Sequence, residues 1–187
     1  RVAHALPSVE RVFWVSLLGS RPDDFARLNQ RAETTPRFAA LPFDHPLFVM
    51  YSSGTTGKPK CIVHGAGGTL LQHVKEHRLH TDLSRVDVMY FFTTCGWMMW
   101  NWLVSGLATG CALVLYEGSP FHPKPDTLVD LIDDLGITVF GVGAKYIASL
   151  EKAGVTPASS HDLSTLRTIL STGSPLTHES FRYVYDD

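Results

Sequence analysis

The chain has 187 residues, of which 44% are hydrophobic and 18% are charged. This composition supports a folded core and excludes an intrinsically disordered protein, which carries more charge and fewer apolar residues. The net charge of −2 predicts neither nucleic acid nor an anionic membrane as a partner. No apolar run approaches the ~20 residues of a membrane span, and residues 1–4 do not open a signal peptide. We therefore expect roughly one cytoplasmic domain, or part of a larger one.

The three cysteines are Cys61, Cys95 and Cys111, an odd number in widely separated apolar segments. No pair has the spacing of a metal site. This pattern predicts buried free thiols in a reducing compartment, and no disulfide.

The first part of the chain predicts a strand at residues 9–18 and a helix at residues 20–32, followed by a connecting loop at residues 33–46. Ser20 is a suitable N-cap for the helix, with Pro22 and two aspartates in the first turn.

Residues 47–60, LFVMYSSGTTGKPK, change from an apolar strand pattern to a loop of hydroxyl residues, glycines and lysines. Glycines let backbone N–H groups turn inward, and lysines add positive charge, so the loop suits a polyphosphate. An ordinary turn between strands is the alternative. A Walker loop is excluded because Ser52 replaces its first glycine and Pro59 follows Lys58. Residues 61–64 read as a second strand.

From residue 87 onward, strands and helices alternate. Strands are expected at 88–93, 112–116, 137–142 and 166–171, and helices at 96–109, 126–135, 145–153 and 177–186. The pattern predicts an α/β fold with a mostly parallel sheet covered by helices on both faces. In such sheets, ligands bind beyond the carboxyl ends of the strands.

A further helix is expected at residues 69–80, with His73, His77 and His80 on one face. A zinc site is conceivable, but no acidic or cysteine partner is close in sequence, so a partly exposed helix face is favoured. His64 could approach the phosphates or simply pack.

Three expected strand ends carry candidate binding segments, at residues 94–100, 141–145 and 171–175. Each has a structural alternative. A Trp/Met stripe at helical spacing is commonly core, a glycine pair also opens helices, and a glycine followed by proline also makes a turn.

The loop string YSSGTTGKPK resembles the signature of the adenylate-forming, or AMP-binding, superfamily, which contains acyl-CoA synthetases, peptide-synthetase adenylation domains and luciferases. Residues 43–46, 61–68, 96–102 and 170–176 are similar to the acetoacetyl-CoA synthetases within it. The resemblance extends from about residue 6 to residue 187. It implies ATP, Mg²⁺ and CoA as co-substrates and acetoacetate as the acid.

The resemblance also assigns site residues. In the family, the loop holds the β- and γ-phosphates of ATP, and the segment after the last strand packs against the adenine and α-phosphate. The matching residues here are Ser52, Ser53, Gly54, Thr55, Thr56, Gly57, Lys58 and Lys60 in the loop, and Gly173, Ser174 and Pro175 after the strand. Ser174 departs from the Gly-Glu-Pro or Gly-Ala-Pro that is common in the family.

The acyl pocket implied by the resemblance is lined by Trp97 and Met98, with Met99 near the arriving CoA thiol. Gly143, where glycine permits close approach, and Thr172 are placed in the same pocket.

Several family groups have no counterpart in residues 1–187: the acidic residue that supports magnesium, the ribose-binding aspartate and the lysine of the C-terminal domain. We therefore expect residues 1–187 to be part of the N-terminal AMP-binding domain, without the C-terminal lid domain, and inactive alone. An inactive nucleotide-binding fragment, another short-chain acyl-CoA synthetase such as an acetate-using one, and a distant P-loop hydrolase are the alternatives.

Overall fold

The computed structural model describes residues 35–52 and 57–187. The chain divides into two units, residues 1–41 and 42–187. In the first unit, the described residues 35–41 form no helix or strand. The expected strand at residues 9–18 and the expected helix at residues 20–32 lie outside the described residues. All described elements belong to the second unit.

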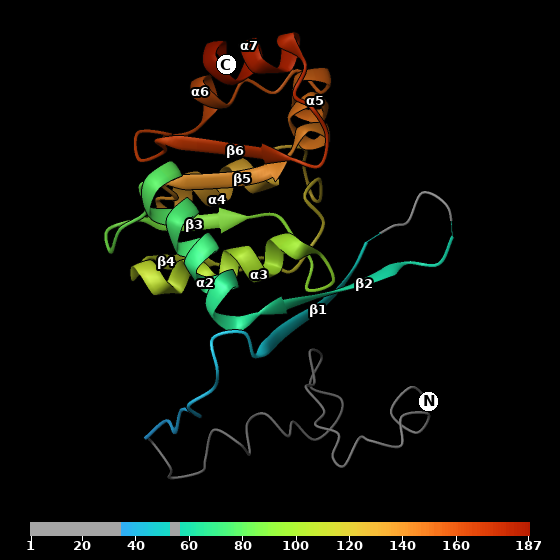
Figure 1. The fold of residues 1–187 in the computed structure, drawn as a ribbon. Coiled ribbons are helices and arrows are strands. Elements are labelled where there is room, and N and C mark those ends of the chain that lie inside the picture. Colours follow the sequence, from blue (N-terminus) through green and yellow to red (C-terminus); the bar gives the residue numbers. More distant parts are fainter. Residues whose placement is uncertain (1–34, 53–56) are drawn as a thin grey trace, which may run out of the picture. The chain divides into compact units, whose positions relative to one another are not determined.

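The second unit begins with an antiparallel hairpin, which Figure 1 shows extending away from the larger sheet. Strand β1 (Pro46–Ser52) pairs with β2 (Lys60–Gly65), and Ser52 lies opposite Lys60. This confirms the predicted strand, loop and strand. Helix α2 (Ala66–Lys75) follows β2 directly and continues into a π-helical turn, η2 (Glu76–His80).

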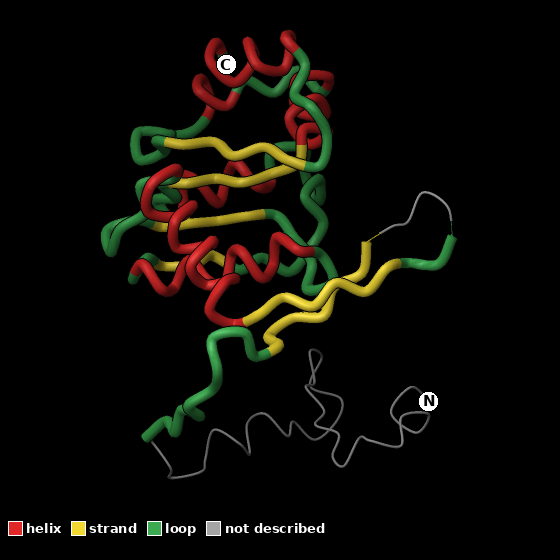
Figure 2. Tube along the Cα trace, in the orientation of Figure 1, coloured by secondary structure: helices red, strands yellow, loops and turns green. Residues whose placement is uncertain are grey.

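The larger sheet has four parallel strands in the order β4-β3-β5-β6 (Figure 2). These strands are β3 (Val88–Phe91), β4 (Ala112–Val114), β5 (Val139–Gly143) and β6 (Thr168–Thr172). The predicted parallel α/β sheet is confirmed.

Helices cover both faces of this sheet because alternate residues on each strand point to opposite sides. Met89, Phe91 and Val139 pack with α3 (Met98–Ser105), which continues into a 3₁₀ turn, η3 (Gly106–Thr109). Tyr90, Phe140 and Val142 form a second cluster. This cluster includes residues of α4 (Thr127–Leu135), α5 (Ala144–Lys152) and α7 (His178–Asp186). Figure 1 accordingly shows α3 in front of the sheet and α4 behind it.

Two details differ from the sequence-based expectation. A short helix, α6 (Pro157–Ser160), precedes β6. Its four residues are too few to produce a periodic apolar pattern. All three cysteines are free as predicted, but only Cys111 is buried, and Cys61 and Cys95 are exposed. The prediction of buried thiols was therefore wrong for two of the three. None of the described helices is long and apolar enough to cross a membrane.

The strand order places a topological switch point between β3 and β5. The chain leaves β3 through α3 to β4 on one side, and leaves β5 through α5 to β6 on the other. Connections that diverge from two neighbouring parallel strands open a crevice at their carboxyl ends. The residues after β3, β5 and β6 are therefore the candidates for ligand binding.

The amino ends of the same strands are joined by a polar network around Asp87, a buried residue. Its carboxylate accepts hydrogen bonds from Thr138 Oγ1 at 2.8 Å, from Arg167 Nε at 3.0 Å and from the backbone N–H of Ser84 at 2.7 Å. Burial raises the pKa of Asp87, but these donors outweigh it and lower the pKa from 3.8 to about 2. The network therefore stabilises the ionised carboxylate at the end of the sheet opposite the crevice.

Replacing Arg167 by methionine is expected to lower the free energy of unfolding by ~2 kcal/mol at neutral pH, because a buried carboxylate loses its cationic partner. The guanidinium is partly exposed, so the loss is smaller than for a fully buried pair. Because the folded pKa is depressed, the stabilisation is present above pH 3.8 and disappears as the pH falls toward about 2. Chemical denaturation across this pH range measures it. Arg182→Met, at an exposed position, is the matched control, and equal losses in the two variants would contradict the assignment.

Candidate functional site

The loop end of the hairpin presents two cations. Lys58 and Lys60 are exposed, and neither ammonium has an ion-pair partner among the described residues. Ser52 and Gly57 flank residues 53–56. Ser53, Gly54, Thr55 and Thr56 were predicted as phosphate ligands and lie outside the described residues. The described part of the loop therefore offers positive charge that no described side chain neutralises.

A first groove lies between the hairpin and the start of α3. It has a volume of about 460 Å³ and is lined by residues 47–51, 95–98 and 101. Asn101 Nδ2 lies 3.3 Å from Met50 Sδ and links the two elements. Trp97 and Met98 remain 38% and 45% exposed on its wall. They are therefore not core residues in this chain, whereas Trp102, one turn further along α3, is buried.

A second groove of about 400 Å³ lies at the carboxyl end of β6. The predicted pocket residues Met98, Met99 and Thr172 all line it, and Met98 also lines the first groove. Gly143 pairs in register with Thr172 at the ends of β5 and β6. A Cβ at Gly143 would lie 3.6 Å from the carbonyl oxygen of Thr172, which is ordinary contact, so glycine is not required there for space. Thr172 Oγ1 has no hydrogen-bond partner within the described part of the chain.

The chain turns away from the sheet immediately after Thr172. Gly173 has φ of +91°, a left-handed conformation that favours glycine. Ser174 and Pro175 follow it and are exposed. These three predicted nucleotide-binding residues thus leave the strand beside the second groove.

The opposite wall of the second groove comes from α2 and η2, through Gln72, His73 and Glu76. Trp102 Nε1 donates to Glu76 Oε2 at 2.9 Å, and Gln72 Nε2 donates to Glu76 Oε1 at 2.6 Å. Sequence reasoning missed Gln72 and Glu76. Their spacing of four residues puts them on one helical face, but which face lines the groove depends on the packing of α2 against α3.

The histidines of this helix do not form an exposed stripe. His77 is 0% exposed, and its Nε2 lies 3.0 Å from Trp102 O and 2.9 Å from Ser105 Oγ. His73 Nδ1 lies 3.0 Å from the same hydroxyl. Burial lowers the pKa of both rings, so both are neutral at neutral pH. The partly exposed helix face that was predicted does not include His77, which is buried because α3 packs over it. His80 is exposed, and these three histidines do not converge on one point as a metal site would require.

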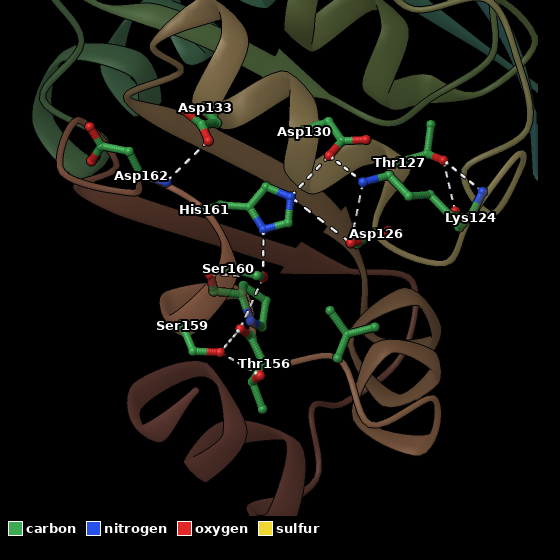
Figure 3. A network of polar contacts seen from close by, with 12 residues as sticks. Lys124, Asp126, Thr127, Asp130, Asp133, Thr156, Ser159, Ser160, His161 and Asp162 are labelled. Atoms are coloured by element: carbon green, nitrogen blue, oxygen red, sulfur yellow. Dashed lines mark hydrogen bonds and ion pairs between the residues drawn. The ribbon is translucent and has the colours of Figure 1, made fainter.

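A different cluster in the described residues has the geometry of metal ligands, and Figure 3 shows it beside α4. His161 Nε2 lies 3.0 Å from Asp130 Oδ1 and 4.0 Å from Asp126 Oδ2. Lys124 Nζ lies 2.8 Å and 3.5 Å from the same two carboxylates. The hydrogen bond from Lys124 is the main cause that lowers the pKa of Asp130. The Lys124 ammonium therefore supplies the positive charge that a metal ion would supply to these carboxylates. The cluster is a structural ion-pair network.

The parallel sheet, its two grooves and the lysine-bearing hairpin can be compared with proteins of known class. A profile of the family described as "AMP-binding enzyme" matches residues 3–186. The chain belongs to this family, and its predicted resemblance to the adenylate-forming superfamily is confirmed.

The narrower resemblance to the acetoacetyl-CoA synthetases is also confirmed. The acetoacetyl-CoA synthetase of Gallus gallus is 51% identical over 199 residues, which cover 98% of this chain and 30% of that enzyme. The Rhizobium meliloti enzyme is 59% identical over 149 residues, covering 80% of this chain and 23% of that enzyme. The structure of acetoacetyl-CoA synthetase from Streptomyces lividans matches 98% of this chain and 29% of its own, with a TM-score of 0.91 and 44% identity. The chain thus spans less than a third of the length of these relatives.

Proposed function

We propose that the complete protein is an acetoacetate–CoA ligase. Acetoacetate attacks the α-phosphate of ATP to give acetoacetyl-AMP and pyrophosphate, and the CoA thiol then displaces AMP to form the thioester. The observation that carries this proposal is the meeting of Met98, Met99 and Thr172 in the second groove. Through Met98 this groove adjoins the first groove, along the hairpin that bears Lys58 and Lys60. The named relatives, which match 98% and 80% of this chain, support it.

We assign the steps to the residues as follows. The hairpin loop, residues 52–60, binds the departing pyrophosphate and stabilises its charge electrostatically. Residues 173–175 contact the nucleotide, and the second groove takes the acyl group. CoA approaches near Met99. No covalent intermediate on the enzyme is required.

Magnesium enters this proposal only as the counter-ion of ATP. Residues 52 and 57–60 offer hydroxyls and ammoniums, whereas Mg²⁺ prefers carboxylate and phosphate oxygens. The loop suits the phosphates and does not suit the metal. We therefore assign Mg²⁺ no ligand among these described loop residues.

The chain is, in this proposal, part of the N-terminal domain of a cytoplasmic enzyme that acts on small molecules. Free cysteines fit a reducing compartment. An acetate-using synthetase is the alternative function. The two functions differ in one requirement of the acyl pocket. Acetoacetate needs a hydrogen-bond donor for its 3-keto oxygen, and acetate does not.

The test is an assay of the complete protein with acetoacetate, acetate and butyrate, each with ATP and Mg²⁺. Pyrophosphate release reports adenylation, and the CoA thioester reports the second step. We expect acetoacetate to give a kcat/KM at least ~10-fold above that of either other acid. Preference for acetate would establish the alternative, and absence of pyrophosphate release with all three acids would overturn both.

A further inference from the structure

The second groove contains a fixed negative charge. Among the described residues that line it, Glu76 is the one carboxylate, and none is a Lys or Arg. Within the described residues, no cation lies within ion-pair distance of Glu76. His73 lines the groove beside it, but burial lowers the pKa of that ring and keeps it neutral.

The carboxylate of Glu76 is oriented by two hydrogen bonds, one to each of its oxygens. Trp102 Nε1, from the buried side of α3, binds one oxygen, and the Gln72 amide binds the other. Trp102 is itself buried, so the position of the indole N–H is set by the core. Both donors are neutral. They orient the charge but do not cancel it.

Resting on the proposed function, we infer that Glu76 is a specificity-determining residue that excludes acids with a second negative charge, such as malonate. Malonate and acetoacetate share the carboxylate, the methylene and the 3-carbonyl oxygen. They differ where malonate carries an anionic oxygen in place of the methyl group. A like charge brought against an uncompensated carboxylate is strongly unfavourable.

The permitted substrate has a neutral tail and meets no such repulsion. The ammoniums of Lys58 and Lys60, unpaired among the described residues, attract the phosphates and the reacting carboxylate toward the hairpin. A neutral acyl tail can therefore enter the second groove with its reacting carboxylate directed toward the nucleotide. The wall formed by β6 carries the Thr172 hydroxyl, which can donate to the 3-keto oxygen.

The test compares Glu76→Gln with wild type in the complete enzyme, using malonate, acetoacetate and butyrate in the pyrophosphate assay. Glutamine keeps an oxygen that accepts from Trp102 Nε1, and the Gln72 amide can rotate to present its oxygen to the new amide. We expect kcat/KM for malonate to rise at least ~10-fold, with the values for acetoacetate and butyrate within ~3-fold of wild type. Glu76→Asp, which keeps the charge, should still reject malonate.

Two controls separate charge in the groove from other effects. Asp134→Asn removes one exposed negative charge from α4, which packs on the other face of the sheet, and should leave all three acids unchanged. Thermal unfolding of each variant reports whether it folds.

An unchanged malonate-to-acetoacetate ratio in Glu76→Gln overturns the inference, as does a parallel change for all three acids. Wild type that uses malonate as well as acetoacetate overturns it while leaving the proposed function intact. Absence of acetoacetate turnover in wild type overturns the proposed function itself.

Discussion

Replacing both Lys58 and Lys60 by alanine in the complete enzyme is expected to lower the rate of adenylation by ~10²-fold or more, because charge stabilisation of the departing pyrophosphate is lost. Both side chains are exposed and unpaired in the described structure. Their removal therefore breaks no ion pair that holds the fold. The effect should appear in the reaction that forms acetoacetyl-AMP, measured by pyrophosphate release at saturating ATP.

The second half-reaction provides an internal control. Started from preformed acetoacetyl-AMP and CoA, it involves no pyrophosphate, so the double variant should retain most of its rate. Lys152→Ala combined with Arg182→Ala removes the same charge from exposed positions on α5 and α7 and should affect neither half. Equal damage to both halves in the Lys58/Lys60 variant would indicate misfolding and contradict a role in binding pyrophosphate.

Replacing Thr172 by valine is expected to lower kcat/KM for acetoacetate by ~10–100-fold while leaving that for butyrate unchanged or improved. A 3-keto oxygen that enters an apolar pocket loses its hydrogen bonds to water, at a cost of ~1–3 kcal/mol unless a donor replaces them. Thr172 lines the second groove, and its Oγ1 has no partner among the described residues, so its hydroxyl is available to donate. Valine has nearly the same shape and removes only that hydroxyl.

The ratio of the two constants decides between a role in recognition and a role in the fold. Thr172→Ser keeps the hydroxyl and should retain most of the preference for acetoacetate. A parallel fall for acetoacetate and butyrate would mean that Thr172 supports the strand end. An unchanged ratio would exclude it as the residue that recognises the keto group.

The two predictions concern residues that the sequence identifies, whereas the Glu76 inference depends on tertiary packing. Lys58, Lys60 and Thr172 were identified from the sequence, because they lie in short strings whose chemistry and resemblance can be read locally. Glu76 was not. The sequence places it on α2 with Gln72, but it becomes part of the groove only because Trp102 of α3 donates to it and Thr172 of β6 faces the same space.

The sequence by itself determined the α/β alternation, the parallel strands, the strand-loop-strand hairpin and the family. These features depend on local properties: the period of apolar residues, the β-branched content, and glycines such as Gly110 and Gly136 that end helices in left-handed conformations. Only the tertiary structure decided which side chains are buried and which are exposed, because the sequence around both kinds is apolar. Cys61 and Cys95 are exposed, Trp97 lines a groove while Trp102 is core, and His77 is enclosed by α3. Burial of a given side chain depends on the neighbouring element that packs over it, and one helix does not encode which partner covers each of its faces.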